Sequence, residues 1–203
     1  MAATIFTNRL QDTISKRFNR GDVELRDWFR DKALQVSSQN TNINRLTQKQ
    51  SSQSNIVPEV RIGRLTMYRY DPKHKDTLPY YDRFPMIFPI EQYKDGWLGI
   101  NMHYLPPVYR ARLMDALWDT TNNAMLNETT KLQINYGVLK SAAKFRYFKP
   151  CIKRYLTGHI RSPLMEIDVN EWDYALFLPL ARFTKARQRD VWNESVNTIM
   201  GRK

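Results

Sequence analysis

The sequence is poor in residue types on which many enzymes and secreted proteins depend. It has one cysteine, Cys151, in 203 residues, so an internal disulfide bond is impossible and no C-x-x-C zinc spacing occurs. Its seven glycines do not cluster into a phosphate-cradling loop. No apolar run approaches the length needed to span a bilayer, and the N-terminal segment lacks the continuous apolar core of a secretory signal. We therefore expect a protein made in the cytosol, with no membrane partner.

Groups suited to catalysis are few and scattered. The histidines, His74, His103 and His159, lie far apart, and His103 falls on an expected strand, where a sheet residue is a better interpretation than a base or a ligand. Cys151 follows a proline near an expected helix start, which could lower its thiol pKa, but a structural thiol is the better interpretation. Three aspartates could hold a divalent cation, as in a metal-dependent nuclease, yet neighbouring basic residues favour local ion pairs: Asp71, Asp76 and Asp82. We predict no catalytic activity, metal or cofactor.

The charge balance of the chain is strongly basic. Its 32 Lys and Arg against 20 Asp and Glu give a formal net charge of +12. Such an excess indicates a polyanionic partner, and nucleic acid is the first candidate. Contact with an acidic protein surface, or a basic face that only serves solubility, would give the same composition.

The basic excess is concentrated between Thr129 and Met165, a segment without Asp or Glu. Aromatic residues are interleaved with its cations, a combination that suits phosphate neutralisation with base stacking, or simple packing of the aromatics. Lys140 and Lys144 are one helical turn apart and could form a cationic ridge. No recognition-helix signature is present, so binding would be sequence-tolerant. The candidate DNA-contacting residues are Lys140, Lys144, Arg146, Lys149, Lys153, Arg154 and Arg161.

A β-hairpin is the clearest structural signal in the chain. Asp95-Gly96 separates two β-prone arms, Phe84–Tyr93 and Trp97–Leu105, each with apolar residues in period two. Pro85 and Pro89 cannot donate backbone hydrogen bonds, which predicts a sheet edge. Gly99 indicates a bulge or a close backbone approach. The opposite face should be wetter, since it carries Glu91, Asn101 and His103.

The remaining patterns predict three regions. Residues 1–35 read as an amphipathic helical arm, residues 36–59 as a polar linker, and residues 60–203 as an α+β domain with a basic helical insertion at 107–160. We expect a small antiparallel sheet that could close into a barrel, with strands at 61–70, 164–167 and 172–178 and helices at 108–118, 129–145, 151–159 and 185–200. The arm's apolar stripe would pack on the chain's own core or dock on a neighbouring subunit through Phe6, Leu10, Ile14 and Phe18.

Three strings in the sequence carry a family resemblance: LPYYDRFPMIFPI (78–90), DGWLGINMHYLPP (95–107) and KPCIKRYL (149–156). They resemble virion proteins of T-even-like contractile-tailed bacteriophages, most closely the DNA end protector family, over roughly residues 62–192. The resemblance implies a non-enzymatic virion protein, made in the host cytoplasm, that binds packaged double-stranded genome ends or the head–tail junction. The alternative is a structural neck or baseplate protein docking on portal, neck or baseplate subunits through its arm. No catalytic residues are carried over.

Overall fold

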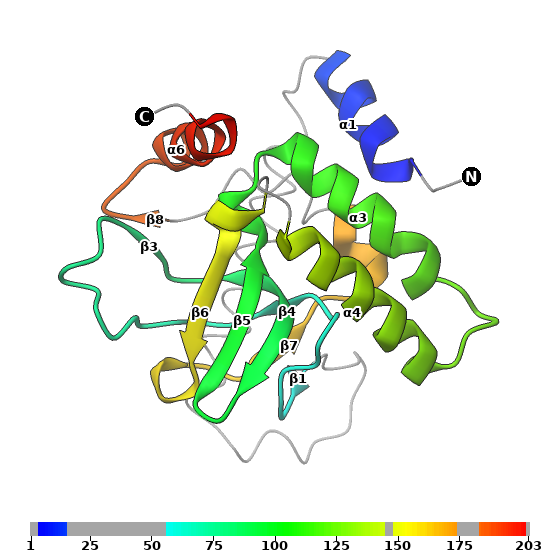
Figure 1. Ribbon diagram of the computed structural model, residues 1–203, viewed down its shortest axis with the longest axis horizontal. Helices are drawn as coiled ribbons and strands as arrows, with labels where there is room; N and C mark the ends of the chain where they lie inside the picture. The colour runs from blue at the N-terminus through cyan, green and yellow to red at the C-terminus, as the bar shows by residue number, and fades with distance from the viewer. Residues whose placement is uncertain (1–3, 16–55, 145–147, 174–182, 202–203) are drawn as a thin grey trace, which may run out of the picture.

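The computed structural model of the protein describes residues 4–15, 56–144, 148–173 and 183–201, which form an α+β fold (Figure 1). Four α-helices lie within these residues: α1 (Ile5–Ser15), α3 (Pro107–Thr121), α4 (Glu128–Lys144) and α6 (Gln188–Met200). The strands are β1 (Ile56–Val57), β2 (Thr66–Met67), β3 (Tyr81–Asp82), β4 (Met86–Tyr93), β5 (Gly96–Asn101), β6 (Ile152–Leu156), β7 (Leu164–Glu166) and β8 (Phe183–Thr184).

The main sheet is antiparallel and open. Its strand order is β1-β7-β2-β4-β5-β6, while β3 and β8 pair separately. The predicted α+β class with an antiparallel sheet is confirmed, but the sheet does not close into a barrel, because no described strand joins β1 to β6. Closure needs tilted strands paired all round, and two-residue strands such as β1 and β2 supply too few pairs.

The predicted hairpin is present as β4 and β5. Their pairing runs from Ile87 opposite Asn101 to Tyr93 opposite Gly96. Gly96 has a φ of +151°, and a Cβ there would lie 1.9 Å from the carbonyl oxygen of Tyr155. Only glycine therefore fits this turn, where the next strand, β6, packs closely against it.

The proline-based prediction of a sheet edge is wrong, because β4 lies inside the sheet between β2 and β5. Pro85 precedes β4. Pro89 lies beyond the end of the two-residue β2, which reaches only Met86 and Ile87, so its missing N–H is not needed there. A register shift between Pro89 and Glu91 faces the turn of β5 where Gly99 lies 2.8 Å, from an ideal Cβ, to Ile87 Cδ1. The expected close approach at Gly99 is confirmed.

Residues 151–159 do not form the predicted helix. The helical turn η4 (Lys149–Cys151) ends after Pro150, and β6 then pairs along β5 from Ile100 opposite Ile152 to Gly96 opposite Leu156. Isoleucine and tyrosine suit a half-buried strand better than their helical spacing suggested. The basic segment predicted as a helical insertion therefore includes a strand of the main sheet.

Other predicted elements differ in extent. The strand expected at 61–70 is reduced to β2 and an isolated bridge between Tyr70 and Ile160. The strand expected at 164–167 is confirmed as β7, and the C-terminal helix as α6. The strand expected at 172–178 begins with two helical residues, and its remainder lies outside the described residues.

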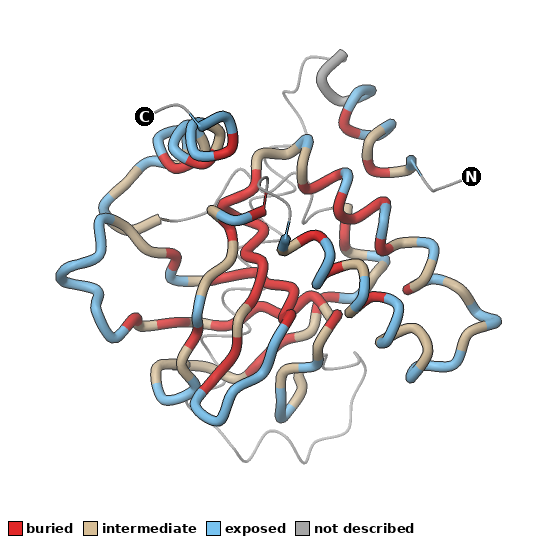
Figure 2. The backbone as a smooth tube through the Cα atoms, viewed as in Figure 1, coloured by how far each residue is buried: buried red, intermediate tan, exposed pale blue. Residues whose placement is uncertain are grey.

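Side chains are buried on both faces of the sheet (Figure 2). Neighbouring residues such as Ile87 and Phe88 belong to different clusters, as alternation along a strand requires. The cluster that joins the helices contains Met86, Phe88, Ile100, Leu113, Met114, Leu117 and Trp172. The other is largely aromatic and contains Tyr68, Tyr70, Trp97 and Tyr155. Asn101 and His103 are 0% exposed, so the wetter face predicted for them is wrong.

Helix α1 packs against α3 rather than extending away from the core (Figure 1). The Phe6 ring meets Trp118 edge-on at a centroid distance of 5.3 Å. Asp115 of α3 accepts hydrogen bonds from the backbone N–H groups of Phe6 (2.8 Å) and Thr7 (3.1 Å). A carboxylate at these otherwise unpaired N–H groups stabilises the helix start.

This packing corrects the picture of a free docking stripe. Phe6 is 1% and Leu10 7% exposed, so both side chains are occupied within the chain and are not available to a neighbouring subunit. The Ile14 side chain and Phe18, the other members of the stripe, lie outside the described residues, as does most of the predicted polar linker.

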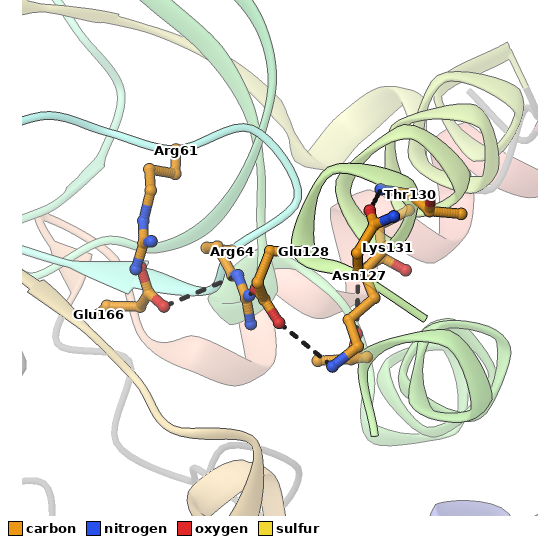
Figure 3. Close-up of polar contacts among 9 residues, drawn as sticks. Arg61, Arg64, Asn127, Glu128, Thr130, Lys131 and Glu166 are labelled. Atoms are coloured by element: carbon orange, nitrogen blue, oxygen red, sulfur yellow. Dashed lines mark hydrogen bonds and ion pairs between the residues drawn. The ribbon is translucent and has the colours of Figure 1, made fainter. Parts of the chain in front are cut away.

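An ion-pair network fastens the start of α4 to the sheet (Figure 3). Glu166 of β7 lies 2.5 Å from Arg61 Nη2 and 3.8 Å from Arg64 Nε. Arg64 also pairs with Glu128, which lies 3.2 Å from Lys131 Nζ. The hydrogen bond from Lys131, together with Arg64, lowers the pKa of Glu128. Acid and base are thus matched at the N-terminal end of α4.

Candidate nucleic-acid interface

The predicted basic residues lie on α4, η4, β6 and the segment after β6. Five of them are exposed, while Lys153 is half-buried and Arg146 lies outside the described residues. The exposed members are Lys140, Lys144, Lys149, Arg154 and Arg161.

Lys140 and Lys144 form an exposed pair near the C-terminal end of α4. The Lys140 ammonium donates a 2.8 Å hydrogen bond to the hydroxyl of Tyr136 and lies 5.1 Å from its ring centroid. This hydrogen bond raises the pKa of Lys140, so the ammonium stays charged. The last turns of the helix therefore present two cations, unlike its neutralised first turn.

Strand β6 gives the sheet a basic edge, since it is the last strand in the described order. The Arg154 guanidinium lies 4.1 Å from the centroid of the Tyr93 ring and pairs with Asp95. The Lys153 ammonium lies 4.3 Å from the centroid of the Tyr104 ring. Burial lowers the pKa of Lys153, and the aromatic ring compensates part of that cost through a cation–π contact.

A cleft of about 570 Å³ opens beside β6, and we call it the tyrosine cleft. Tyr80 and Tyr81 are half-buried in its wall, and Tyr80 donates a 2.8 Å hydrogen bond to Glu194. Burial raises the pKa of Tyr80 and of Tyr104, so their phenols are neutral. The residues used below are Tyr70, Tyr80, Tyr81, Tyr104, Lys153 and Arg154. The cleft thus combines neutral aromatic surface with cations.

A buried polar network supports the cleft from behind. Asp82 Oδ2 lies 2.6 Å from His103 Nδ1 and accepts a 3.0 Å hydrogen bond from Asn101 Nδ2. The Asn101 amide also donates to the Tyr155 hydroxyl at 2.9 Å, and Phe84 N–H donates to Asp82 Oδ1 at 3.0 Å. These groups satisfy one another away from water, so the network fixes the positions of Asp82 and Tyr155 in the cleft lining.

A second hollow of about 360 Å³, the arginine pocket, adjoins the tyrosine cleft. Four cationic side chains line it against one carboxylate, that of Asp71: Arg69, Lys75, Arg83 and Arg161. Asp71 pairs with Lys75 at 3.1 Å, which confirms the local ion pairing expected for this loop. The two hollows share Tyr70 and Tyr81.

The sequence analysis missed most of the arginine pocket. Of its cations, only Arg161 belongs to the predicted basic segment. Arg69 and Arg83 come from outside it, and the isolated bridge between Tyr70 and Ile160 brings these parts of the chain together. Mixed Arg and Tyr residues around positions 69–83 were the available signal, but nothing in the sequence indicated that this stretch meets Arg161.

The remaining reactive groups have structural roles. Cys151 is buried, and burial raises the pKa of its thiol to about 12, so the structural interpretation is better supported than an activated thiolate. Within the described ranges, no group of three or more His, Cys, Asp or Glu side chains is placed to hold a metal ion. No helix in this part of the chain is long and apolar enough to cross a membrane.

The open α+β fold, with its basic edge and aromatic cleft, has the surface features of a binding protein. A family model described as phage T4 terminal DNA protecting protein matches residues 10–197. The chain therefore belongs to the phage terminal DNA protecting protein family, which is a family of bacteriophage structural proteins. The match also extends N-terminal to the segment that carried the sequence resemblance. Neither the curated proteins nor the solved structures gave a significant match.

Proposed function

We propose that this protein covers the ends of the packaged linear double-stranded genome by non-catalytic, sequence-tolerant binding. The family match is the observation that carries the proposal, because its description names terminal DNA as what is protected. The basic edge supports it physically. An end that is covered by a bound protein is closed to nucleases, and such protection needs cations rather than an active site.

The contacts would be made chiefly to phosphates. The exposed cations of α4, η4 and β6 occupy elements that follow one another in the chain and approach one another at one end of α4 (Figure 1). Neutralising phosphates releases condensed counterions and gives affinity without base readout. A protein that must accept whatever sequence lies at an end requires this kind of contact.

The proposal includes a location in the virion, after synthesis in the host cytoplasm, with portal or neck proteins as neighbours. The alternative of a neck or baseplate protein that docks through its N-terminal arm has weaker support. Two of the four side chains expected to make that contact, Phe6 and Leu10, are buried in the chain's own core.

Exonuclease protection tests the proposal directly. Linear duplex DNA incubated with the protein should resist a processive exonuclease that starts at ends, while a covalently closed circle of the same sequence remains open to a restriction endonuclease. Unchanged exonuclease digestion at saturating protein would refute end protection. Magnesium-dependent cutting of the closed circle by the protein would instead restore the metal-nuclease alternative.

A further inference from the structure

We propose that the tyrosine cleft and the arginine pocket together bind the last, unpaired nucleotide of a DNA strand. The terminal phosphate would lie in the arginine pocket and the base against the tyrosines. This inference rests on the proposed function and deepens it, because it names what distinguishes an end from the interior of a duplex.

The arginine pocket has the chemistry of a phosphate site. Its cations outnumber its single carboxylate, and that carboxylate is already paired with Lys75. The backbone on both sides is held in place: Arg69 N–H donates to Ser162 Oγ at 2.8 Å, and Tyr70 N–H donates to the Arg83 carbonyl at 2.9 Å. Within the described part of the chain, neither the Arg69 nor the Arg83 guanidinium forms an ion pair. Planar guanidinium groups match phosphate oxygens in pairs.

The tyrosine cleft has the chemistry of a base site. Its volume of about 570 Å³ falls within the range of pockets that hold small organic ligands. Tyr80 and Tyr81 are half-buried, so each keeps part of its surface open. Every base has a π-face, and stacking on tyrosine is therefore tolerant of sequence. Lys153 and Arg154 at the β6 wall add cations that can meet the next phosphate along the strand.

The adjacency of the two hollows selects an end. Tyr70 and Tyr81 line both, so a ligand that fills them needs an anionic group and a flat ring linked at short range, as in one nucleotide. A base inside a duplex must unpair and unstack before it can enter, whereas a terminal base pays least for doing so. A frayed or overhanging nucleotide with a terminal phosphate is therefore the ligand that fits.

DNA hairpins with a single open end provide the test on the full-length protein. The set compares a blunt end without phosphate, a one-nucleotide overhang without phosphate, and the same overhang carrying either a 5′ or a 3′ phosphate. We expect tightest binding to one of the two phosphorylated overhangs, with about a tenfold or greater loss when that phosphate is removed, as for a charge-assisted hydrogen bond. The favoured arm tells which strand end is bound.

Variants assign the effect to the two hollows. The double change Arg69→Gln and Arg83→Gln should abolish the preference for the phosphate, while Arg112→Gln, an exposed arginine of α3 that lines neither hollow, should keep it. Tyr81→Leu should weaken binding of the overhang by about 5-fold to 150-fold. A fluorescent 2-aminopurine placed as the overhanging base should be quenched by the unaltered protein, which gives a readout that does not depend on the folding of a variant.

The outcomes separate this inference from the proposed function. Equal binding of all hairpins, with no quenching, would overturn the nucleotide site while leaving end protection intact. Binding of no hairpin would remove both. A preference for phosphate that survives the double arginine change would also overturn the assignment, because the phosphate would then be held elsewhere.

Discussion

Neutralising Lys140 and Lys144 on α4 should change the salt dependence of DNA binding in a countable way. Five predicted contact cations are exposed in the described structure. At about 0.9 of a counterion released per phosphate, five contacts give a slope of log K against log salt of about −4.5. Raising salt from about 50 to about 200 mM should then weaken binding about 500-fold. The double change Lys140→Gln and Lys144→Gln leaves three contacts, a slope of about −2.7 and a loss of about 40-fold.

The assay is equilibrium binding to a linear duplex, by fluorescence anisotropy, across a series of salt concentrations and with two unrelated sequences. The structure provides a matched control on the same helix. Lys131 is also a lysine of α4, but its side chain is 14% exposed and its ammonium pairs with Glu128 at 3.2 Å. Lys131→Gln should therefore leave the slope unchanged.

Two results would refute this reasoning. If the double change leaves the slope at its original value, Lys140 and Lys144 do not contact phosphates. If it weakens one duplex sequence much more than the other, the contacts are to bases, and the sequence-tolerant surface is the wrong description.

Three further predictions concern stability and reactivity. Asp82→Ala leaves buried partners such as His103 unpaired, so urea unfolding should show a loss of about 3–5 kcal/mol. Asp115→Ala removes the acceptor for the first N–H groups of α1, which should cost about 1–3 kcal/mol and speed proteolysis near residue 15. Cys151 should resist alkylation by iodoacetamide at pH 8 until urea is added. Because burial raises its pKa from 9.0 to about 12, its contribution to stability should be complete below about pH 9 and be lost as the pH rises through about 12.

The hairpin was predictable because its signals are local. An Asp-Gly pair and apolar residues in period two lie within one short stretch, and β4 and β5 form as expected. What surrounds the hairpin was not predictable in the same way. The partner of His103 is Asp82, which β3 supplies from a separate two-stranded ribbon, so a face predicted to be wet became a buried network.

The candidate site shows the same limit. The acid-free segment located Lys140, Arg154 and Arg161 as exposed cations from sequence alone. It could not reveal that Arg161 joins Arg69 and Arg83 around one hollow, because that depends on chain segments about 80 residues or more apart. Helical spacing also misled at β6, where Ile152 and Tyr155 pack as strand residues and turn the basic run into a sheet edge.

The position of β6 at the end of the sheet also bears on how copies of the protein behave when crowded. A terminal strand exposes backbone donors and acceptors that another copy can pair with, and lysine and arginine side chains on such a strand oppose that pairing. Lys153 and Arg154 lie in the middle of β6. Removing both charges should therefore promote self-association through this strand, detectable as a concentration-dependent mass in light scattering even when no DNA is present.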